Sequence, residues 1–240
     1  MSAMRTICLI PARGGSKRIP RKNIRVFCGR PMIEWSILAA QQSKCFERII
    51  VSTDDAEIAD VARQAGAEVP FDRPAALADD HATTIDVVRH AIGALEEQGE
   101  RPDAICCLYA TAPFVRAGDI RDGRDLLGDA AYAIPVTSFG FPIQRAVRIA
   151  DGRLAMFQPD QYFTRSQDLE DAYHDAGQFY WGKTEAWRKC VALFGSQTAP
   201  ILLPRWRVQD IDTPEDWKRA ELMFSVLNSD LLSSTDRQGH

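Results

Sequence analysis

Short apolar segments alternate with amphipathic segments along most of the chain. The apolar, β-prone segments lie at 5–11, 47–52, 67–71, 104–109, 130–137 and 200–204. Apolar residues with helical spacing occupy 32–43, 54–66, 85–98, 118–127 and the stretch that begins at 214. Strands that alternate with helices are typical of a parallel sheet covered on both faces. The pattern therefore predicts an α/β fold, with a Rossmann-like, mostly parallel sheet and helices on both faces.

Local signals mark the starts of several helices. Pro31 stands where the first helical position is expected, a position that proline favours. Thr83 or Thr84 provides a side-chain oxygen to cap the helix at 85–98. Pro214 opens the last helix. These starts depend on neighbouring residues alone, so the sequence predicts them without knowledge of the fold.

The alternation is interrupted in the third quarter of the chain. Residues 145–157 resemble two strands joined by an Asp151-Gly152 turn, which indicates a hairpin. We expect an inserted hairpin region at 139–182. The α/β pattern then returns, with an extended segment expected at 205–212 before the last helix.

Length and composition fit one soluble globular domain. The chain has 240 residues, of which 45% are hydrophobic and 26% charged, and this is enough to bury a sizeable core. We expect a single domain over 1–228 and a flexible polar tail at 229–240. The formal net charge of −4 shows no basic excess, so neither nucleic acid nor a membrane surface is an expected partner.

The cysteines and the apolar runs suggest a cytoplasmic protein. The six cysteines show no CxxC pairing, and several lie in apolar segments where a thiol packs as a small hydrophobe. No apolar run approaches the length of a membrane-spanning helix, and the N-terminus lacks a signal-peptide pattern. We therefore expect reduced core cysteines and a cytoplasmic location.

The loop after the first strand concentrates positive charge around two glycines. Gly14 and Gly15 are surrounded by five cations, Arg13, Lys17, Arg18, Arg21 and Lys22. In open parallel sheets, ligands bind beyond the carboxyl ends of the strands. Glycine lets the backbone approach a ligand, and the cations suit a triphosphate. The alternative is a basic loop that only faces water, as most charge runs do.

A second candidate is the pair Asp210 and Asp212, which lies just before the last helix. Side chains two apart in an extended segment point the same way, and two carboxylates so placed suit a hard cation such as Mg²⁺. The alternative is a helix start, because Thr213 and Asp216 form a capping pattern around Pro214. The metal interpretation gains weight from the candidate triphosphate loop.

Other chemistries fit less well. Residues 177–184 match the GxxxxGK[ST] phosphate-loop pattern, but the positions between the glycines are bulky and strand-prone, where such a loop needs small, pliable residues. No GxSxG motif occurs, and the four histidines show no ligand-like spacing. A phosphate-loop ATPase, a serine hydrolase and a zinc enzyme are therefore set aside.

At this point the residues resemble a known family, the CMP-sugar synthetases that activate sialic acids and related acidic sugars. The resemblance spans nearly the whole chain and rests on motifs in the family's order: IPARGGSKRIPRKN at 10–23, IIVSTDD at 49–55, FDRPAALADDHATT at 71–84 and DIDT at 210–213. TAPF at 111–114, FPIQRA at 141–146 and RSQDLEDAYHDAGQFYWG at 165–182 look most like the pseudaminic acid cytidylyltransferases. Ala110 departs from the pattern, since the family usually has proline there.

The resemblance implies roles for individual residues. Those expected to bind nucleotide are Arg13, Gly14, Gly15, Ser16, Lys17, Lys22, Asn23, Arg73, Ala82 and Thr84. Those expected to bind the sugar are Gln144, Arg165, Gln167, Tyr173, His174, Gln178 and Tyr180. Arg165 is the candidate for the sugar carboxylate, because a guanidinium fits a carboxylate with two parallel hydrogen bonds. Asp210 and Asp212 would bind Mg²⁺, and the hairpin region would form a homodimer.

The implied reaction joins CMP from CTP to the anomeric hydroxyl of an acidic nine-carbon sugar, most like pseudaminic acid, and releases pyrophosphate. Arg13, Lys22 and Asp212 would act in catalysis by positioning groups and neutralising charge. A CMP-sialic or CMP-legionaminic acid synthetase stays open as an alternative. So does a catalytically silent sugar-nucleotide binding protein, because fold alone does not fix function.

Overall fold

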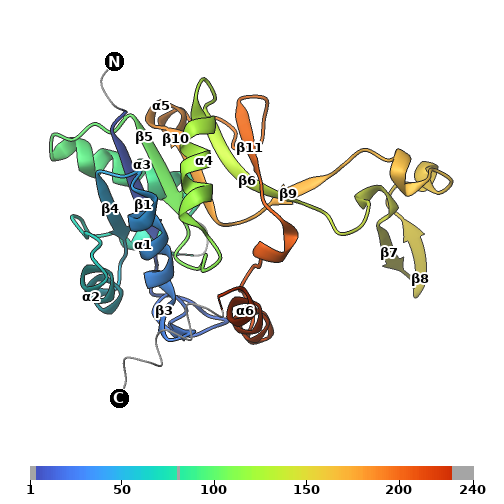
Figure 1. Cartoon of the computed structure of the whole chain (residues 1–240), viewed down its shortest axis with the longest axis horizontal. Coiled ribbons are helices and arrows are strands. Elements are labelled where there is room, and N and C mark those ends of the chain that lie inside the picture. The colour runs from blue at the N-terminus through green and yellow to red at the C-terminus, as the bar shows by residue number, and fades with distance from the viewer. Residues whose placement is uncertain (1–3, 80–81, 229–240) are drawn as a thin grey trace.

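The computed structural model describes residues 4–79 and 82–228, so the tail expected at 229–240 lies outside the described residues. Within these residues the core is a seven-stranded sheet in the order β11-β6-β10-β5-β1-β4, with β9 also paired to β6 (Figure 1). Its strands are β1 (Thr6–Pro11), β4 (Arg48–Ser52), β5 (Ala104–Leu108), β6 (Tyr132–Ser138), β9 (Tyr173–Asp175), β10 (Phe179–Lys183) and β11 (Thr198–Leu202). Short strands β2 (Val26–Phe27) and β3 (Arg30–Pro31) pair with each other.

The sheet is mostly parallel, as predicted. β1 runs parallel to β4 and β5, and β11 runs parallel to β6. β10 lies between β5 and β6 and is antiparallel to both. A side chain at Gly182 in β10 would collide with Trp187 and Tyr132, so this strand packs closely against its surroundings.

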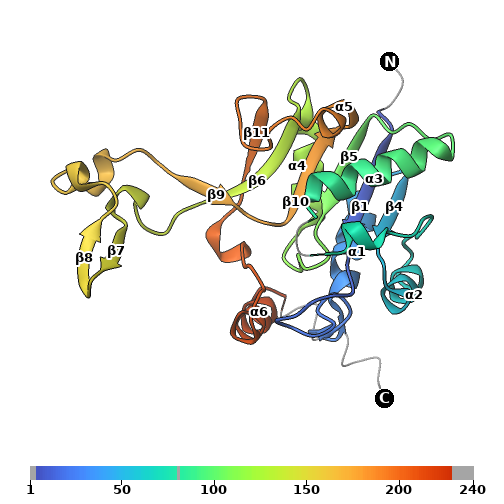
Figure 2. The same cartoon turned by 180° about the vertical axis from the view of Figure 1, so that it is seen from behind.

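Helices cover both faces of the sheet. They are α1 (Met32–Ser43), α2 (Ala56–Gln64), α3 (Thr84–Glu97), α4 (Ala117–Leu127), α5 (Thr184–Arg188) and α6 (Pro214–Leu227). One core cluster includes buried residues of α1, α2 and α4, and another includes those of α3 and α5 (Figures 1 and 2). Helices on both faces confirm the predicted layering.

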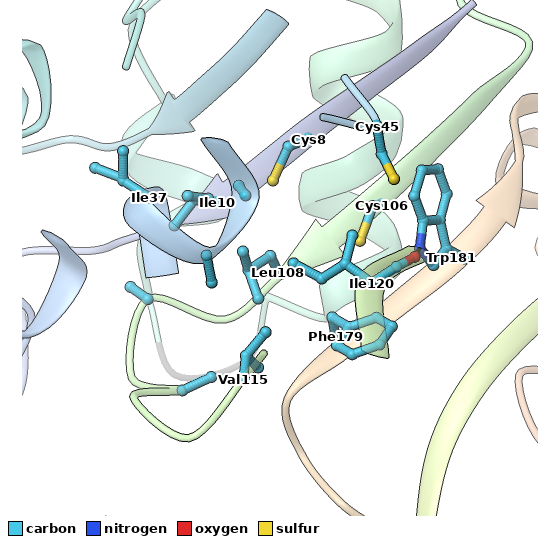
Figure 3. Close-up of a cluster of buried hydrophobic side chains, with 14 of the residues drawn as sticks. Cys8, Ile10, Ile37, Cys45, Cys106, Leu108, Val115, Ile120, Phe179 and Trp181 are labelled. Atoms are coloured by element: carbon cyan, nitrogen blue, oxygen red, sulfur yellow. Dashed lines mark hydrogen bonds between the residues drawn. The ribbon is translucent and has the colours of Figure 1, made fainter. Parts of the chain in front are cut away.

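Buried cysteines contribute to the first of these clusters. Cys8 on β1 and Cys106 on β5 are register partners and have no exposed surface. Cys45 lies in the same cluster with Trp181, whose indole donates a hydrogen bond to the Ile120 carbonyl at 2.9 Å (Figure 3). No disulfide joins the six cysteines: Cys8, Cys45, Cys106 and Cys107 are buried in the core as predicted, whereas Cys28 is half-buried and Cys190 is exposed.

The helix starts follow the local signals. Thr83 and Asp86 form a reciprocal capping box at α3, and Thr213 and Asp216 form another at α6. Pro31 stands at the N-cap of α1, one position before its predicted place inside the helix. A separate cluster packs α6 against β2 and against the loop that follows β1.

A slender arm leaves the sheet after β6 and returns at β9 (Figures 1 and 2). It carries the antiparallel pair β7 (Val147–Ala150) and β8 (Arg153–Met156), so the predicted hairpin is confirmed. Asp151 and Gly152 both have positive φ angles, 52° and 71°, as a two-residue hairpin turn requires. The arm also contains the short 3₁₀ turns η2 (Ile143–Arg145), η3 (Pro159–Gln161) and η4 (Ser166–Asp168).

Three local expectations were wrong. Residues 67–71 form only an isolated bridge at Glu68, before the 3₁₀ turn η1 (Ala75–Leu77). The segment expected to be extended at 205–212 begins with the 3₁₀ turn η5 (Arg205–Arg207). The end of the expected hairpin region belongs to the main sheet, as β9 and β10.

No helix in the described part of the chain is long and apolar enough to span a bilayer.

Candidate functional site

A cavity of about 540 Å³ lies at the carboxyl ends of β1 and β5. Pro11, the last residue of β1, and Tyr109, which follows β5, both line it. Most residues predicted to bind nucleotide line it as well: Arg13, Ser16, Lys17, Lys22, Asn23, Arg73, Ala82 and Thr84. We name this space the first cavity. It is strongly cationic, and it lies where ligands of open α/β sheets bind.

The basic loop after β1, which contains Gly14 and Gly15, contacts the start of α2. The Gly14 N–H donates to Asp54 Oδ1 at 3.0 Å, and a Cβ at Gly14 would stand 2.7 Å from Asp55 Oδ2. Glycine is therefore required there by packing. Gly15 is exposed, and neither glycine is among the residues that line the first cavity. Arg21 turns to Asp55 and Glu57 instead of the cavity.

Arg73 is buried with an unsatisfied donor at the first cavity. Its Nε donates to Ser52 Oγ at 3.1 Å, while its buried Nη2 has no hydrogen-bond partner. Burial lowers the pKa of the Arg73 guanidinium, against the opposing effect of the Asp54 carboxylate. A buried unpaired donor is costly, so the position fits a ligand that supplies an oxygen acceptor.

The basic loop and the aspartate pair meet at Asp212. Lys22 Nζ lies 3.1 Å from Asp212 Oδ1, and Arg18 Nη2 lies 2.5 Å from Asp212 Oδ2. Asn23 Nδ2 donates to the Arg13 carbonyl at 2.9 Å and so braces the same loop. Asp212 lines the first cavity, and it also lines a second one.

The structure confirms the helix-start interpretation of the aspartate segment. Thr213 and Asp216 do start α6 through a capping box, as the helix-start alternative requires. Asp210 and Asp212 nevertheless both line the second cavity. Within residues 4–79 and 82–228 no group of three or more His, Cys, Asp or Glu side chains is arranged to hold a metal ion. Two carboxylates fit a hard cation only if phosphate or water oxygens complete its shell.

The second cavity adjoins the first and has a volume of about 800 Å³. Lys22, Tyr109 and Thr111 line both cavities. Two of the expected sugar-binding residues, His174 and Tyr180, line the second cavity. The other five do not: Gln144, Arg165 and Gln167 lie on the arm, Tyr173 is exposed on β9, and Gln178 is buried.

Thr84, Tyr109 and Tyr180 place hydroxyl groups between the two cavities. Thr84 Oγ1 lies 3.1 Å from the Tyr109 hydroxyl, and the Tyr109 and Tyr180 rings meet edge to face at 5.5 Å between centroids. Tyr180 donates to Asp175 Oδ2, and the Gly177 N–H donates to Asp175 Oδ1 at 2.9 Å. Burial, followed by the neighbouring Tyr109, raises the pKa of Tyr180, so this hydroxyl stays protonated at neutral pH.

Sequence reasoning did not select Tyr109 or Arg205, and both line the second cavity. Tyr109 ends an apolar strand segment, so it resembled an ordinary core aromatic. Its position directly after a parallel strand was the signal that could have identified it. Arg205 precedes the motif at 210–213 and belongs to no motif itself.

Comparison with known proteins gives a consistent result. Residues 7–179 match the family model described as cytidylyltransferase. The chain is 42% identical to a pseudaminic acid cytidylyltransferase of Campylobacter jejuni subsp. jejuni serotype O:2, over 93% of this chain and 97% of that protein. It is 33% identical to a CMP-N,N'-diacetyllegionaminic acid synthase of Legionella pneumophila subsp. pneumophila, over 95% of this chain and all of that protein.

Among solved structures, the fold is similar to a CMP:2-keto-3-deoxy-manno-octonic acid synthetase complexed with CTP. That likeness has a TM-score of 0.67 at 16% identity, and it covers 92% of this chain and 98% of the other. At this level of identity the similarity concerns the fold alone.

Proposed function

This chain belongs to the cytidylyltransferase family, and we propose that it transfers CMP from CTP to the anomeric hydroxyl of a nonulosonic acid, with pseudaminic acid preferred. The observation that carries the proposal is the cationic first cavity with the unsatisfied Arg73 donor at its wall. Such a donor suits an oxygen of the nucleotide, and the cations suit its phosphates. The identity to a pseudaminic acid cytidylyltransferase over nearly the whole chain supports the choice of sugar.

In the proposed complex the triphosphate lies along the basic loop. Arg13, Lys17 and Lys22 neutralise phosphate charge, while Arg73, Ala82 and Thr84 surround the base. The sugar occupies the second cavity, next to His174 and Tyr180. Because Lys22 lines both cavities, its ammonium stands where the two substrates would meet.

In the reaction the anomeric oxygen attacks the α-phosphorus of CTP in line. A new oxygen–phosphorus bond forms, the bond to the bridging oxygen breaks, and pyrophosphate leaves with that electron pair while the hydroxyl proton is released. The protein contributes chiefly by holding the two reactants in line and by offsetting the charge of the leaving group. Arg13 and Lys22 are the cations that we assign to the leaving group.

We assign Mg²⁺ to Asp210 and Asp212. Their fit is that of two hard oxygen ligands beside a cationic phosphate cavity, with further ligands to come from phosphate and water. When bound, Mg²⁺ would polarise the phosphate and lower the pKa of the attacking hydroxyl. In this structure the Asp212 carboxylate pairs with Lys22 and Arg18.

We also assign the arm to a homodimer interface. Its hairpin exposes Ile149 by 79% and Leu154 by 72%, and Phe163 beyond the hairpin is exposed by 90%. Apolar surface of this extent on a projecting element is typical of an interface. The aromatic residues at the end of the 139–182 region, Phe179, Tyr180 and Trp181, add nothing to this surface, because all three are buried in the main sheet.

A pyrophosphate-release assay tests the function directly. The purified chain is given CTP and Mg²⁺ with pseudaminic, legionaminic or sialic acid, and formation of the CMP-sugar is followed in parallel. We expect release with all components present and the highest kcat/KM with pseudaminic acid. Binding of CTP without pyrophosphate release from any of these sugars would instead identify a silent nucleotide-binding protein.

A further inference from the structure

The cations of the second cavity differ in whether they already have an anionic partner. Lys22 pairs with Asp212, and Arg219 pairs with Asp216 at 2.8 Å. Arg205 also lines this cavity and is exposed, yet it pairs with no carboxylate in residues 4–79 and 82–228. An arginine beside a cavity with no anion of its own is suited to an anionic group of the ligand.

The backbone that carries Arg205 is held by a buried polar network. Arg207, two residues further on, forms a two-pronged ion pair with Asp119 of α4, at 2.5 Å and 3.0 Å. The Gln178 amide donates to the Arg207 carbonyl at 2.7 Å. These groups are all buried, so they fix the η5 turn against the sheet. The Arg205 side chain therefore extends from a backbone turn that is held in place.

Space for the Arg205 guanidinium is left by Gly140, where the arm begins. A Cβ at Gly140 would stand 2.9 Å from Arg205 Nη1. The guanidinium therefore occupies the position that any larger residue at 140 would take. Gly140 has no positive φ angle, so close approach of this side chain is what a glycine permits there.

Arg165, the residue that the sequence suggested for the sugar carboxylate, is placed differently. It lies on the arm, does not line the second cavity, and already pairs with Asp168 through Nε at 2.7 Å and Nη2 at 3.2 Å. Its two-pronged donor set is occupied by a neighbour three residues away.

We propose that Arg205 binds the carboxylate of the acidic sugar in the second cavity. The inference rests on the proposed function and names the residue that recognises the acid group of that substrate. A guanidinium binds a carboxylate by donating two parallel N–H···O bonds, which lysine cannot reproduce. Arg205 thus distinguishes acidic sugars from neutral ones.

The test compares Arg205→Gln, Arg205→Lys and the control Arg165→Gln, each with the free sugar acid and with its methyl ester. We expect Arg205→Gln to raise KM for the acid by about tenfold or more, because a site built for a polar group loses most when the pair is broken. KM for CTP should stay within about twofold of the parent, since the nucleotide lies in the other cavity. The KM of Arg205→Lys for the acid should lie between those of the parent and Arg205→Gln. The preference for the acid over its methyl ester should be lost in Arg205→Gln.

A second variant moves the guanidinium without removing it. Gly140→Ala displaces only the far end of a flexible side chain, so the melting temperature should not change while KM for the acid rises. An unchanged KM for the sugar acid in Arg205→Gln would overturn the assignment of Arg205, and so would a tenfold rise of this KM confined to Arg165→Gln. In either case, pyrophosphate release by the parent enzyme would still support the proposed function. A parent enzyme that uses none of the acidic sugars would overturn both.

Discussion

The ammonium of Lys22 lies 2.8 Å from the Ile211 carbonyl and 3.1 Å from Asp212 Oδ1. This contact joins the loop after β1 to the segment before α6, two regions that are 190 positions apart in the chain. The cationic loop and the aspartate pair, which the sequence identified separately, are therefore parts of one site.

The first prediction concerns Lys22. We expect Lys22→Ala to lower kcat by about tenfold or more, because an aligned cation at the leaving group is removed. Loss of this part-buried ion pair should cost no more than about 1 kcal/mol of unfolding free energy. Steady-state kinetics and urea unfolding of the same preparation measure the two effects.

Arg21→Ala, which removes a loop cation that faces α2, is the matched control and should keep near-normal kcat. Near-parental kcat in a folded Lys22→Ala protein would refute the assignment.

The second prediction separates a metal ligand from a helix start. Asp212→Asn keeps the side-chain shape but removes the charge that a hard cation needs, so we expect weaker Mg²⁺ binding, with activity titrating at higher Mg²⁺, and loss of most activity. Thr213→Ala instead removes the cap of α6 and should lower stability by about 1 kcal/mol. Its Mg²⁺ titration of activity should match the parent. If Asp212→Asn shows the parental Mg²⁺ titration, the carboxylate serves only the structure.

A third prediction follows from the ion pair between Asp55 and Arg21. The hydrogen bond from Arg21, with the backbone N–H of Ile58, lowers the pKa of Asp55 below its usual value. The unfolded chain therefore binds this proton more readily, and the stabilisation is complete above about pH 4 and is lost as pH falls through the lower folded pKa.

Asp55→Asn tests this effect, since asparagine still caps a helix but carries no charge. The difference in unfolding free energy between parent and variant should be largest at neutral pH and should shrink below about pH 4. Denaturant unfolding across the acid range measures it. Glu57→Gln, which removes a more exposed partner of the same arginine, should show a smaller difference. A difference that does not vary with pH would contradict the linkage.

The fourth prediction addresses the arm. Ile149 and Leu154 are cross-strand partners in the hairpin, and both are exposed. Replacing both with glutamate places two charges in the proposed interface, so light scattering at micromolar concentration should change from the mass of two chains to that of one. Leu222→Glu, on the exposed side of α6, should leave the mass unchanged. A parent protein with the mass of one chain would refute the dimer.

Much of the fold could be predicted because its signals are local. The predicted segment at 32–43 coincides with α1, and the Asp151-Gly152 turn forms as expected, since proline and glycine act through their own backbone geometry. The reversed direction of β10 was not predicted. A buried strand has the same apolar composition in either direction, and its orientation depends on neighbours far away in the sequence.

The same difference between local signals and long-range contacts explains which residues of the candidate site could be predicted. Motif residues that follow a strand, such as Lys22, lie at the cavity because the loop itself is placed by the strand. Arg165 belongs to an equally specific motif, but it lies on the arm and does not line the second cavity. Arg205 reaches that cavity through a turn held by Gln178 and Asp119, and no short sequence pattern records such long-range support.

The last prediction concerns His174 and the choice of sugar. His174 Nδ1 lies 2.8 Å from the Asp175 carbonyl, and its ring meets the edge of Phe139 at 4.9 Å between centroids. It also lines the second cavity, so its other ring nitrogen is available to a ligand or to solvent.

If His174 hydrogen-bonds to a polar substituent of the sugar, His174→Ala should lower kcat/KM for pseudaminic acid by about tenfold while CTP affinity and thermal stability stay close to the parent. If it only braces β9 against Phe139, the melting temperature should fall and all sugars should lose turnover alike, as they should in Phe139→Ala. Measuring both variants with pseudaminic and sialic acids separates these outcomes, and equal turnover of the two sugars by the parent would defeat the specificity claim whatever His174 does.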